Sequence, residues 1–546
     1  MEPGSYLRTR DQARAYSFAS RWAEALPLWQ QLTEENPVDG RNWQGLAEAS
    51  FAVGRYRGAL VAYRQVGRLG VHDDEHLAVL PGAPEYLIAR CHAALGDHDA
   101  ALSALADAMR NGFTRIDEAV QDSHLEPLRV DPRFRAVLDI TDADGLPRNA
   151  GWRTDLGKIV REARRRRPVP LPAPRATEFD AAADQLHTAI PGLSDAEVMV
   201  GMMRLLALLD DGHAFLEVPS GHDTLSRALP VQFYDFAEGL YVTSAEPAYA
   251  SLLGERVLAL GDSPVLEVLR AVEPLICRDN EYRPGEIAPT YLRRTPVLHA
   301  LGVIDSPDSA RLTTPAGEFD VVARRGNIPR SRHFPNSPTM RQYHDPRSAP
   351  LYLRHTDRNF WFERLPEHQS IYCQINSVGD SESESIESFS NRLGRSIDDG
   401  ECRHLVIDIR WNSGGNVFLL PALLDSVLRC RGLHHSSGYF LIVGRRTFSA
   451  SANLAKYLEW FVRPHLTIIG EPPSTSLECV GETVPFELPY SNLLCNISNL
   501  YWQGMTPLDR RSWIAPDILV SPTFAAYRQG CDLSMAAAMA TLRAHG

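Results

Sequence analysis

A 34-residue period constrains the fold of the first 112 residues more strongly than any other feature of the chain. Residues 21–37 read RWAEALPLWQQLTEENP and residues 55–70 read RYRGALVAYRQVGRLG, and the two segments align. Ala25 and Ala59 are 34 residues apart, as are Trp29 and Tyr63. A repeat of this length is typical of stacked helix pairs, because a single pair cannot bury its apolar face alone.

The period resembles that of tetratricopeptide repeats. The large and small residues of the second unit fall where that repeat places them: Trp43, Leu46, Ala47, Gly54 and Tyr56. A third unit, over residues 85–112, is displaced by an eight-residue insertion around residues 71–82 and carries Ala89, Gly96, Ala101 and Ala108. The resemblance implies an all-α solenoid over residues 1–145 that binds a peptide or protein partner. The alternative is a packing platform for the next domain.

Composition excludes several classes of function. The chain has 546 residues, 44% of them hydrophobic, and a net charge of -12, which argues against a nucleic-acid binder. The N-terminal residues contain no apolar core of a signal peptide, and no run of eighteen apolar residues occurs in the sequence, so we expect a cytoplasmic protein with no membrane partner. The eight cysteines form no Cys-x-x-Cys pair and no Cys/His cluster, so we expect neither a metal nor a cofactor.

Residues 438–461, GYFLIVGRRTFSASANLAKYLEWF, combine a predicted buried strand, a turn and a helix. The apolar run ends at Val443, and apolar residues recur at helical spacing from Ser449 onward. Unpaired N–H groups and the positive end of the helix dipole collect at a helix N-terminus, where they can stabilise an oxyanion. Ser449 is therefore a candidate nucleophile, and the alternative is an ordinary N-cap serine.

Two further segments carry candidate site residues. Ser194 and Glu197 have the spacing of a capping box, and the apolar helix that they begin ends in Asp-Asp-Gly-His, which would present His213 in a cleft. The alternative is a structural histidine. Residues 405–416, LVIDIRWNSGGN, place Gly414 and Gly415 after a strand, where free N–H groups suit an anion or a carbonyl oxygen.

The middle of the chain gives weaker signals. Residues 254–269, GERVLALGDSPVLEVL, predict strand, turn and helix, and they resemble part of a PDZ domain. Residues 324–358 form a long loop rich in cationic residues, including Arg332, His333, Arg341, His344 and Arg354. These cations could hold a peptide carboxylate, and the alternative is a solvated excursion.

The order of the segments resembles one family. LLALLDDGHA, HLVIDIRWNSGGN, GRRTFSASAN, TIIGEPPSTS, SWIAPDILV and GCDLSMAAAM follow one another as in the C-terminal-processing (tail-specific) serine peptidases and the tricorn core protease. This resemblance covers roughly residues 150–546. It implies an α/β core of the crotonase and Clp type, built as a ββα spiral. The expected division is a helical subdomain at 146–222, a β-rich or PDZ-like subdomain at 223–330 and a catalytic core at 331–546.

The resemblance also implies roles for the candidate residues. Ser449 matches the nucleophile, with Ser451 as the alternative. The N–H of Ala450 and that of Gly414 or Gly415 would form the oxyanion hole. His213 matches the histidine that tricorn-type members use as general base.

The chain departs from the family pattern at two positions. Ser476 stands where tail-specific members have the basic lysine, and Arg510 stands where tricorn-type members have a glutamate. The group that would orient the histidine is left open among three carboxylates: Asp211, Glu482 and Asp509.

The expected function is therefore a serine peptidase that cleaves peptides or unfolded proteins, with the repeats recruiting substrate or a partner. A second hypothesis is an inactive scaffold that binds peptides without cleaving them. An esterase or hydratase on the same core is a third.

Overall fold

The computed structural model describes residues 3–71, 81–222, 224–326, 340–345, 349–398, 402–428, 438–506 and 508–545. The chain divides into two compact units. One consists of residues 1–146 and 160–167, and the other of residues 147–159 and 168–546. In the described part of the chain, no helix has both the length and the apolar character that crossing a membrane requires.

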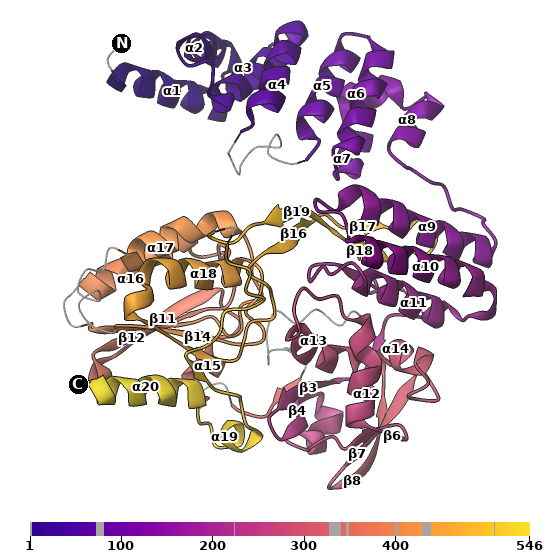
Figure 1. Ribbon diagram of the computed structural model, residues 1–546, viewed down its shortest axis with the longest axis vertical. Helices are drawn as coiled ribbons and strands as arrows, with labels where there is room; N and C mark the ends of the chain where they lie inside the picture. Colours follow the sequence, from indigo (N-terminus) through magenta and orange to yellow (C-terminus); the bar gives the residue numbers. More distant parts are fainter. Residues whose placement is uncertain are drawn as a thin grey trace. The chain divides into compact units, whose positions relative to one another are not determined.

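The first unit is a stack of helices in which each helix from α1 to α5 packs against the next, and α8 packs against α6 (Figure 1). Its helices are α1 (Pro3–Phe18), α2 (Trp22–Glu35), α3 (Gly40–Ala52), α4 (Tyr56–Leu69), α5 (Ala83–Ala94), α6 (His98–Arg110), α7 (Ile116–Gln121) and α8 (Pro132–Val137). The repeating pattern predicted from the sequence thus corresponds to successive helix pairs. The greater part of the insertion, residues 72–80, lies outside the described residues.

The 34-residue period reflects how these helices pack. Ala25, Ala59 and Ala101 are fully buried at equivalent positions of α2, α4 and α6. The Trp29 ring lies against Gly45 of α3, where the Cβ of any other residue would be 2.4 Å from the ring. Small residues are therefore required where neighbouring helices approach most closely.

The second unit is built around a six-stranded sheet of order β11-β12-β13-β14-β15-β20. Its strands are β11 (Phe360–Leu365), β12 (Ser370–Ile375), β13 (His404–Asp408), β14 (Tyr439–Val443), β15 (Leu466–Gly470) and β20 (Ile518–Leu519). The first pair is antiparallel and all the others are parallel. Because parallel strands are covered on both faces, β14 is apolar at every position, as its sequence predicts.

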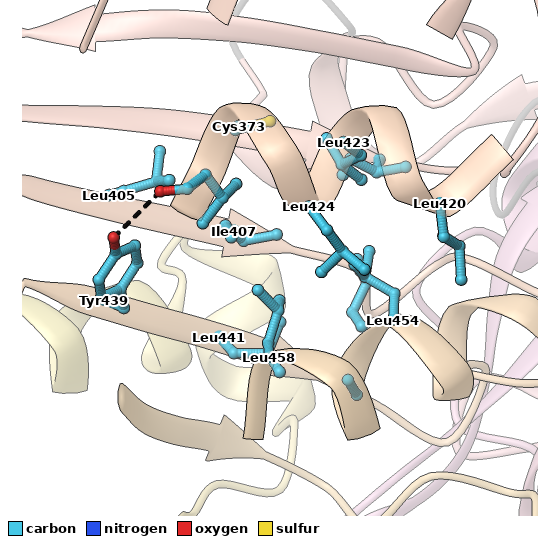
Figure 2. Close-up of a cluster of buried hydrophobic side chains, with 14 of the residues drawn as sticks. Cys373, Leu405, Ile407, Leu420, Leu423, Leu424, Tyr439, Leu441, Leu454 and Leu458 are labelled. Carbon is cyan, nitrogen blue, oxygen red and sulfur yellow. Dashed lines mark hydrogen bonds between the residues drawn. The ribbon is translucent and has the colours of Figure 1, made fainter. Parts of the chain in front are cut away.

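Helices cover both faces of this sheet (Figure 1). Alternate residues of the strands, such as Leu405, Ile407 and Leu441, pack against α16 (Ile386–Asp398), α17 (Leu420–Leu428) and α18 (Ala450–Val462). Figure 2 shows the leucines of α17 and α18 beside these strands. The intervening residues pack against α20 (Leu533–His545). The Tyr439 hydroxyl donates a hydrogen bond of 3.2 Å to the Val427 carbonyl oxygen, which ties β14 to the end of α17.

The remainder of the second unit combines helices with small sheets. Helices α9 (Arg148–Arg166), whose residues from 160 onward belong to the first unit, α10 (Ala173–Ala189) and α11 (Asp195–Ala207) precede β1 (Phe215–Glu217), β3 (Val231–Phe236) and β4 (Gly239–Ala245). The predicted strand, turn and helix are β5 (Ala259–Leu260), β6 (Ser263–Pro264) and α12 (Val265–Val272), and β7 (Ser309–Thr314) and β8 (Gly317–Val322) complete that four-stranded sheet. Between them lie α13 (Arg283–Tyr291) and α14 (Thr295–Ala300). Two of the predicted loop cations, Arg332 and His333, lie outside the described residues.

Late in the chain, two small antiparallel sheets complete the fold. Strand β16 (Cys479–Thr483) pairs with β19 (Ser498–Trp502), and β18 (Leu494–Asn496) lies between β1 and β17 (Phe486–Glu487). The Asp155 carboxylate of α9 is fully buried and accepts hydrogen bonds from the N–H groups of Tyr490 (2.8 Å) and Ser491 (2.9 Å). This pairing fixes the loop between β17 and β18 to the first helix of the unit.

Candidate active site

Ser449 lies at the turn from β14 to α18 in a backbone conformation that is rare for a residue other than glycine. Its φ is 57° and its ψ is -127°, and it occupies the N-cap position of α18 without a side-chain capping hydrogen bond. Such a conformation costs on the order of 1–3 kcal/mol and persists only where the surroundings enforce it. The geometry therefore favours the nucleophile interpretation of Ser449 over that of an ordinary cap.

The neighbours of Ser449 hold the turn in place. The Thr447 hydroxyl donates to the Ile409 carbonyl oxygen (3.0 Å) and accepts from the Gly444 N–H (3.1 Å). Ser451, the alternative nucleophile, is fully buried, and its hydroxyl donates to the Asn412 carbonyl oxygen at 2.7 Å. Ser451 thus holds the turn, whereas the Ser449 side chain is partly exposed.

The glycine pair that follows β13 packs directly against this turn. Gly414 has a φ of 111°, and a Cβ at that position would lie 2.7 Å from the Ser449 Cβ and 3.2 Å from the Ala450 nitrogen. The Gly414 N–H donates to the Asn412 Oδ1 at 2.8 Å. The N–H groups of Gly415 and Ala450 donate to no acceptor in the described part of the chain.

His213 follows α11 in a turn that Asp211 organises. The Asp211 carboxylate is fully buried and accepts from the backbone N–H groups of His213 (2.9 Å) and Ala214 (3.1 Å). It also accepts from the Ser498 N–H (3.0 Å) and hydroxyl (2.8 Å). Asp211, one of the three candidates for the orienting acid, therefore secures the backbone of the histidine turn.

The structure brings His213 and Ser449 to the same cavity, which has a volume of about 450 Å³. The His213 ring lies 4.5 Å from the ring of Phe448, the residue before Ser449. The two residues are separated by more than 230 positions in the sequence, so only the fold brings them together.

The other two candidate acids, Glu482 and Asp509, lie near the surface. Glu482 is an exposed residue, although partial burial of its carboxyl group raises its pKa. Asp509 is bonded to the guanidinium group of Arg511 at 2.7 Å, and this hydrogen bond lowers the pKa of its carboxyl group. Arg510, which replaces the family glutamate, is exposed.

A carboxylate that sequence reasoning missed, Asp279, lies beside the histidine turn. A Cβ at Gly212 would be 3.0 Å from the Asp279 Oδ1, which is buried without a hydrogen-bond partner among the described residues. The other oxygen accepts from the Thr475 hydroxyl at 3.0 Å, and burial raises the pKa of Asp279 to about 6. Asp279 follows Arg278 in a segment with no recognisable pattern, so no sequence signal could have identified it.

Ser476, which stands where tail-specific members have the basic lysine, has a structural role. The Ser476 hydroxyl donates to the Asp279 carbonyl oxygen at 2.6 Å and so holds the backbone at that point. The lysine of α18, Lys456, is buried, and its ammonium group donates to the Leu477 carbonyl oxygen at 2.7 Å. Lys456 lies seven residues beyond Ser449, about 10 Å along the helix, and it is not among the described residues that line the cavity of Ser449 and His213, so we do not assign it as the base.

Comparison with known proteins tests the resemblance. No family model and no curated protein matches the sequence. Among solved structures, mature CPAF complexed with lactacystin matches 72% of this chain and 98% of its own, with 11% identity and a TM-score of 0.52. The matched part of the chain has the fold of CPAF.

Two other matches have lower TM-scores. The photosystem II D1 C-terminal processing protease matches 69% of this chain and 94% of its own, with 13% identity and a TM-score of 0.30. PcrH in complex with the chaperone binding region of PopD matches 26% of this chain and 95% of its own, with 21% identity and a TM-score of 0.18. The CPAF match confirms, at the level of the fold, the resemblance inferred from the order of the segments.

Proposed function

We propose that the protein is a serine peptidase that hydrolyses peptide bonds through an acyl-enzyme intermediate on Ser449. The observation that carries the proposal is the backbone of Ser449, held at a φ of 57° on the wall of a cavity that also contains His213. A strained turn from strand to helix exposes a serine hydroxyl while keeping the N–H groups of the helix N-terminus beside it. The CPAF fold supports the same conclusion.

In this mechanism, the Ser449 Oγ attacks the carbonyl carbon of the substrate while the His213 imidazole accepts the hydroxyl proton. The C–N bond then breaks as His213 returns that proton to the leaving amine. Water, deprotonated by His213, attacks the acyl ester, and the serine hydroxyl is regenerated with release of the carboxylic acid.

The oxyanion of each tetrahedral intermediate requires preorganised donors. We assign this role to the N–H groups of Gly415 and Ala450, since the Gly414 N–H is already bonded to Asn412. Gly414 contributes instead by lacking a side chain where the chain passes Ser449. Loss of one oxyanion donor typically reduces kcat by a factor of about 100 to 1,000.

The helical repeats have a separate proposed role. We assign them the recruitment of a peptide segment, from the substrate or from a partner protein, because stacked helix pairs present an extended concave surface. We also propose that the second unit divides at residues 222 and 330, as the sequence predicts. We further propose that its core is a spiral of the crotonase and Clp type.

Covalent labelling with a fluorophosphonate tests the assignment of the nucleophile. We expect the label at Ser449 by mass spectrometry, with labelling lost in Ser449→Ala and strongly slowed in His213→Ala. Ser413 lies on the same cavity wall and its side chain is exposed, so Ser413→Ala is the matched control that should label normally.

Peptide hydrolysis by the same variants completes the test. Full hydrolysis by Ser449→Ala would overturn the proposal. Absence of labelling together with peptide binding to the intact protein would favour the inactive scaffold, and turnover of acyl esters without any peptide cleavage would favour an esterase.

A further inference from the structure

Asp279 belongs to a segment whose backbone is held on both sides. The segment leads into α13. The Asn280 amide group donates to the carbonyl oxygens of Pro473 (3.0 Å) and Ser512 (3.1 Å). Because the Ser476 hydroxyl also donates to the Asp279 carbonyl oxygen, these bonds fix the place of the carboxylate.

The two oxygens of this carboxylate have different surroundings. Oδ2 accepts a hydrogen bond of 3.0 Å from the Thr475 hydroxyl. Oδ1 is buried without a hydrogen-bond partner among the described residues and lies against Gly212, the residue before His213. A Cβ at Gly212 would be 3.0 Å from this oxygen and 3.1 Å from the Asp279 Cγ. The absence of a side chain at Gly212 therefore lets the histidine turn come this close to the carboxylate.

The Phe448 ring connects this contact to the candidate nucleophile. The ring is buried, and its Cε2 would lie 3.2 Å from the same Cβ position at Gly212. Its centre is 4.5 Å from that of the His213 ring, and the next residue along the chain is Ser449. One packed group thus contains the buried carboxylate, the histidine turn and the residue before the nucleophile.

The charged groups around Asp279 come from several elements. The Arg283 guanidinium of α13 favours the ionised carboxylate, and the Asp211 carboxylate of the histidine turn opposes it. The Cys479 thiol of β16 and the Lys456 ammonium group of α18 also interact electrostatically with Asp279. Burial outweighs the attraction of Arg283 and raises the pKa of Asp279 to about 6. The carboxylate is therefore mostly ionised at neutral pH and becomes neutral in mild acid.

The proposed reaction places a positive charge on His213 when its imidazole accepts the Ser449 proton. A negative charge stabilises such a cation more strongly inside a protein than in water, because the surroundings screen it less. We propose that Asp279 is a positioning residue of the candidate active site, whose ionised carboxylate supports the histidine turn and stabilises the imidazolium form of His213. The role in hydrolysis rests on the proposed peptidase function, whereas the effect on His213 can be measured without hydrolysis.

The titration of His213 tests this proposal. It is followed by NMR on the full-length protein with ¹⁵N-labelled histidine, and the His213 signals are assigned with His213→Ala. Asp279→Asn removes the charge at nearly constant volume and can still accept the hydrogen bond from Thr475. We expect the titration midpoint of His213 to move to lower pH by about one unit, which is a tenfold change in proton affinity.

The pH dependence of fluorophosphonate labelling gives a second readout. If the reactive form requires both a neutral His213 and an ionised Asp279, the logarithm of the labelling rate should rise with a slope of about two at pH values below both ionisations. In Asp279→Asn, the slope should be about one and the maximal rate about tenfold lower. A loss of folded protein would lower the rate without changing the slope from two to one.

Asp155→Asn is the matched control. Asp155 is also a buried carboxyl group whose pKa is raised by burial, but it does not line the cavity. This variant should preserve both the titration midpoint of His213 and the slope of the labelling rate.

The role of Asp279 is disproved if Asp279→Asn leaves the titration midpoint of His213 unchanged. It is also disproved if the wild-type protein labels with a slope of about one throughout, a result that needs no variant to fold. The peptidase proposal is judged separately, by labelling at Ser449. A moved midpoint without labelling would support the role of Asp279 and reject the peptidase, whereas labelling with an unmoved midpoint would do the reverse.

Discussion

Asp279 shows how burial alters the chemistry of a single residue. Its Oδ1 is enclosed without a partner beside the turn that carries His213, and its pKa is raised to about 6 because burial penalises the charged form. The nearby Arg283 opposes this shift but does not cancel it. The folded protein therefore retains a proton on Asp279 at pH values where the unfolded chain has lost it.

This shift predicts a pH dependence of stability. In the unfolded chain Asp279 loses its proton near pH 4, and in the folded chain it does so near pH 6, so the free energy of unfolding falls as the pH rises through this window. Asp279→Asn removes the contribution and can still accept from Thr475. Between pH 4 and pH 7, we expect the free energy of unfolding of this variant to rise by on the order of 2–3 kcal/mol relative to that of the wild type, measured by urea unfolding. If the difference in the free energy of unfolding between the variant and the wild type stayed constant across this range, the raised pKa would be contradicted.

At the scale of elements, the candidate site is the meeting point of two turns that follow neighbouring parallel strands. One turn follows β13 and carries the glycine pair, and the other follows β14 and carries Ser449. Asn412 binds both turns: its side chain accepts from the Gly414 N–H, and its carbonyl oxygen accepts from the Ser451 hydroxyl. Because the strands are in register, the two turns reach the same edge of the sheet.

This packing predicts a severe effect of one methyl group. In Gly414→Ala, the new Cβ would lie 2.7 Å from the Ser449 Cβ and would require a φ of 111°, so the two turns must separate. We expect labelling of Ser449 to slow by a factor of about 100 or more, as for loss of an oxyanion donor. The control is Gly192→Ala, where the added Cβ has nothing within 4 Å and the labelling rate should be unchanged. Equal rates in the two variants would disprove the close approach.

The elements also show which parts of the molecule could be predicted from the sequence. The capping box of Ser194 and Glu197 forms as predicted, since both of its hydrogen bonds are local, and the strand-turn-helix of Ser449 forms for the same reason. Asp279 was missed because its place beside the histidine turn arises only where distant segments converge. Local spacing carries no information about such convergence.

At the scale of the whole molecule, the chain contains two units with separate hydrophobic cores. The buried residues of the helical repeats cluster with one another, and the core of the large sheet is formed by α16, α17 and α18. Units with independent cores can fold independently.

This independence predicts that damage to the repeats leaves the candidate active site intact. Gly45→Val would place its side chain into the Trp29 ring and should lower the melting temperature of the first unit by several degrees. Labelling of Ser449 in the same protein should proceed at the wild-type rate. Gly58→Ala, where the added Cβ would meet only Ser50 at 3.8 Å, is the control for the repeats. Parallel loss of stability and labelling would show that the two units fold as one.

The buried bonds between Asp211 and Ser498 join residues that are 287 positions apart. After the histidine turn has been synthesised, more than half of the chain must still be made before Ser498 can bond to Asp211. Ser449 is also made before Ser498. A growing chain, or one truncated before β19, therefore carries the serine and the histidine without the bonds that fix the histidine turn, so hydrolysis should begin only after Ser498 has left the ribosome.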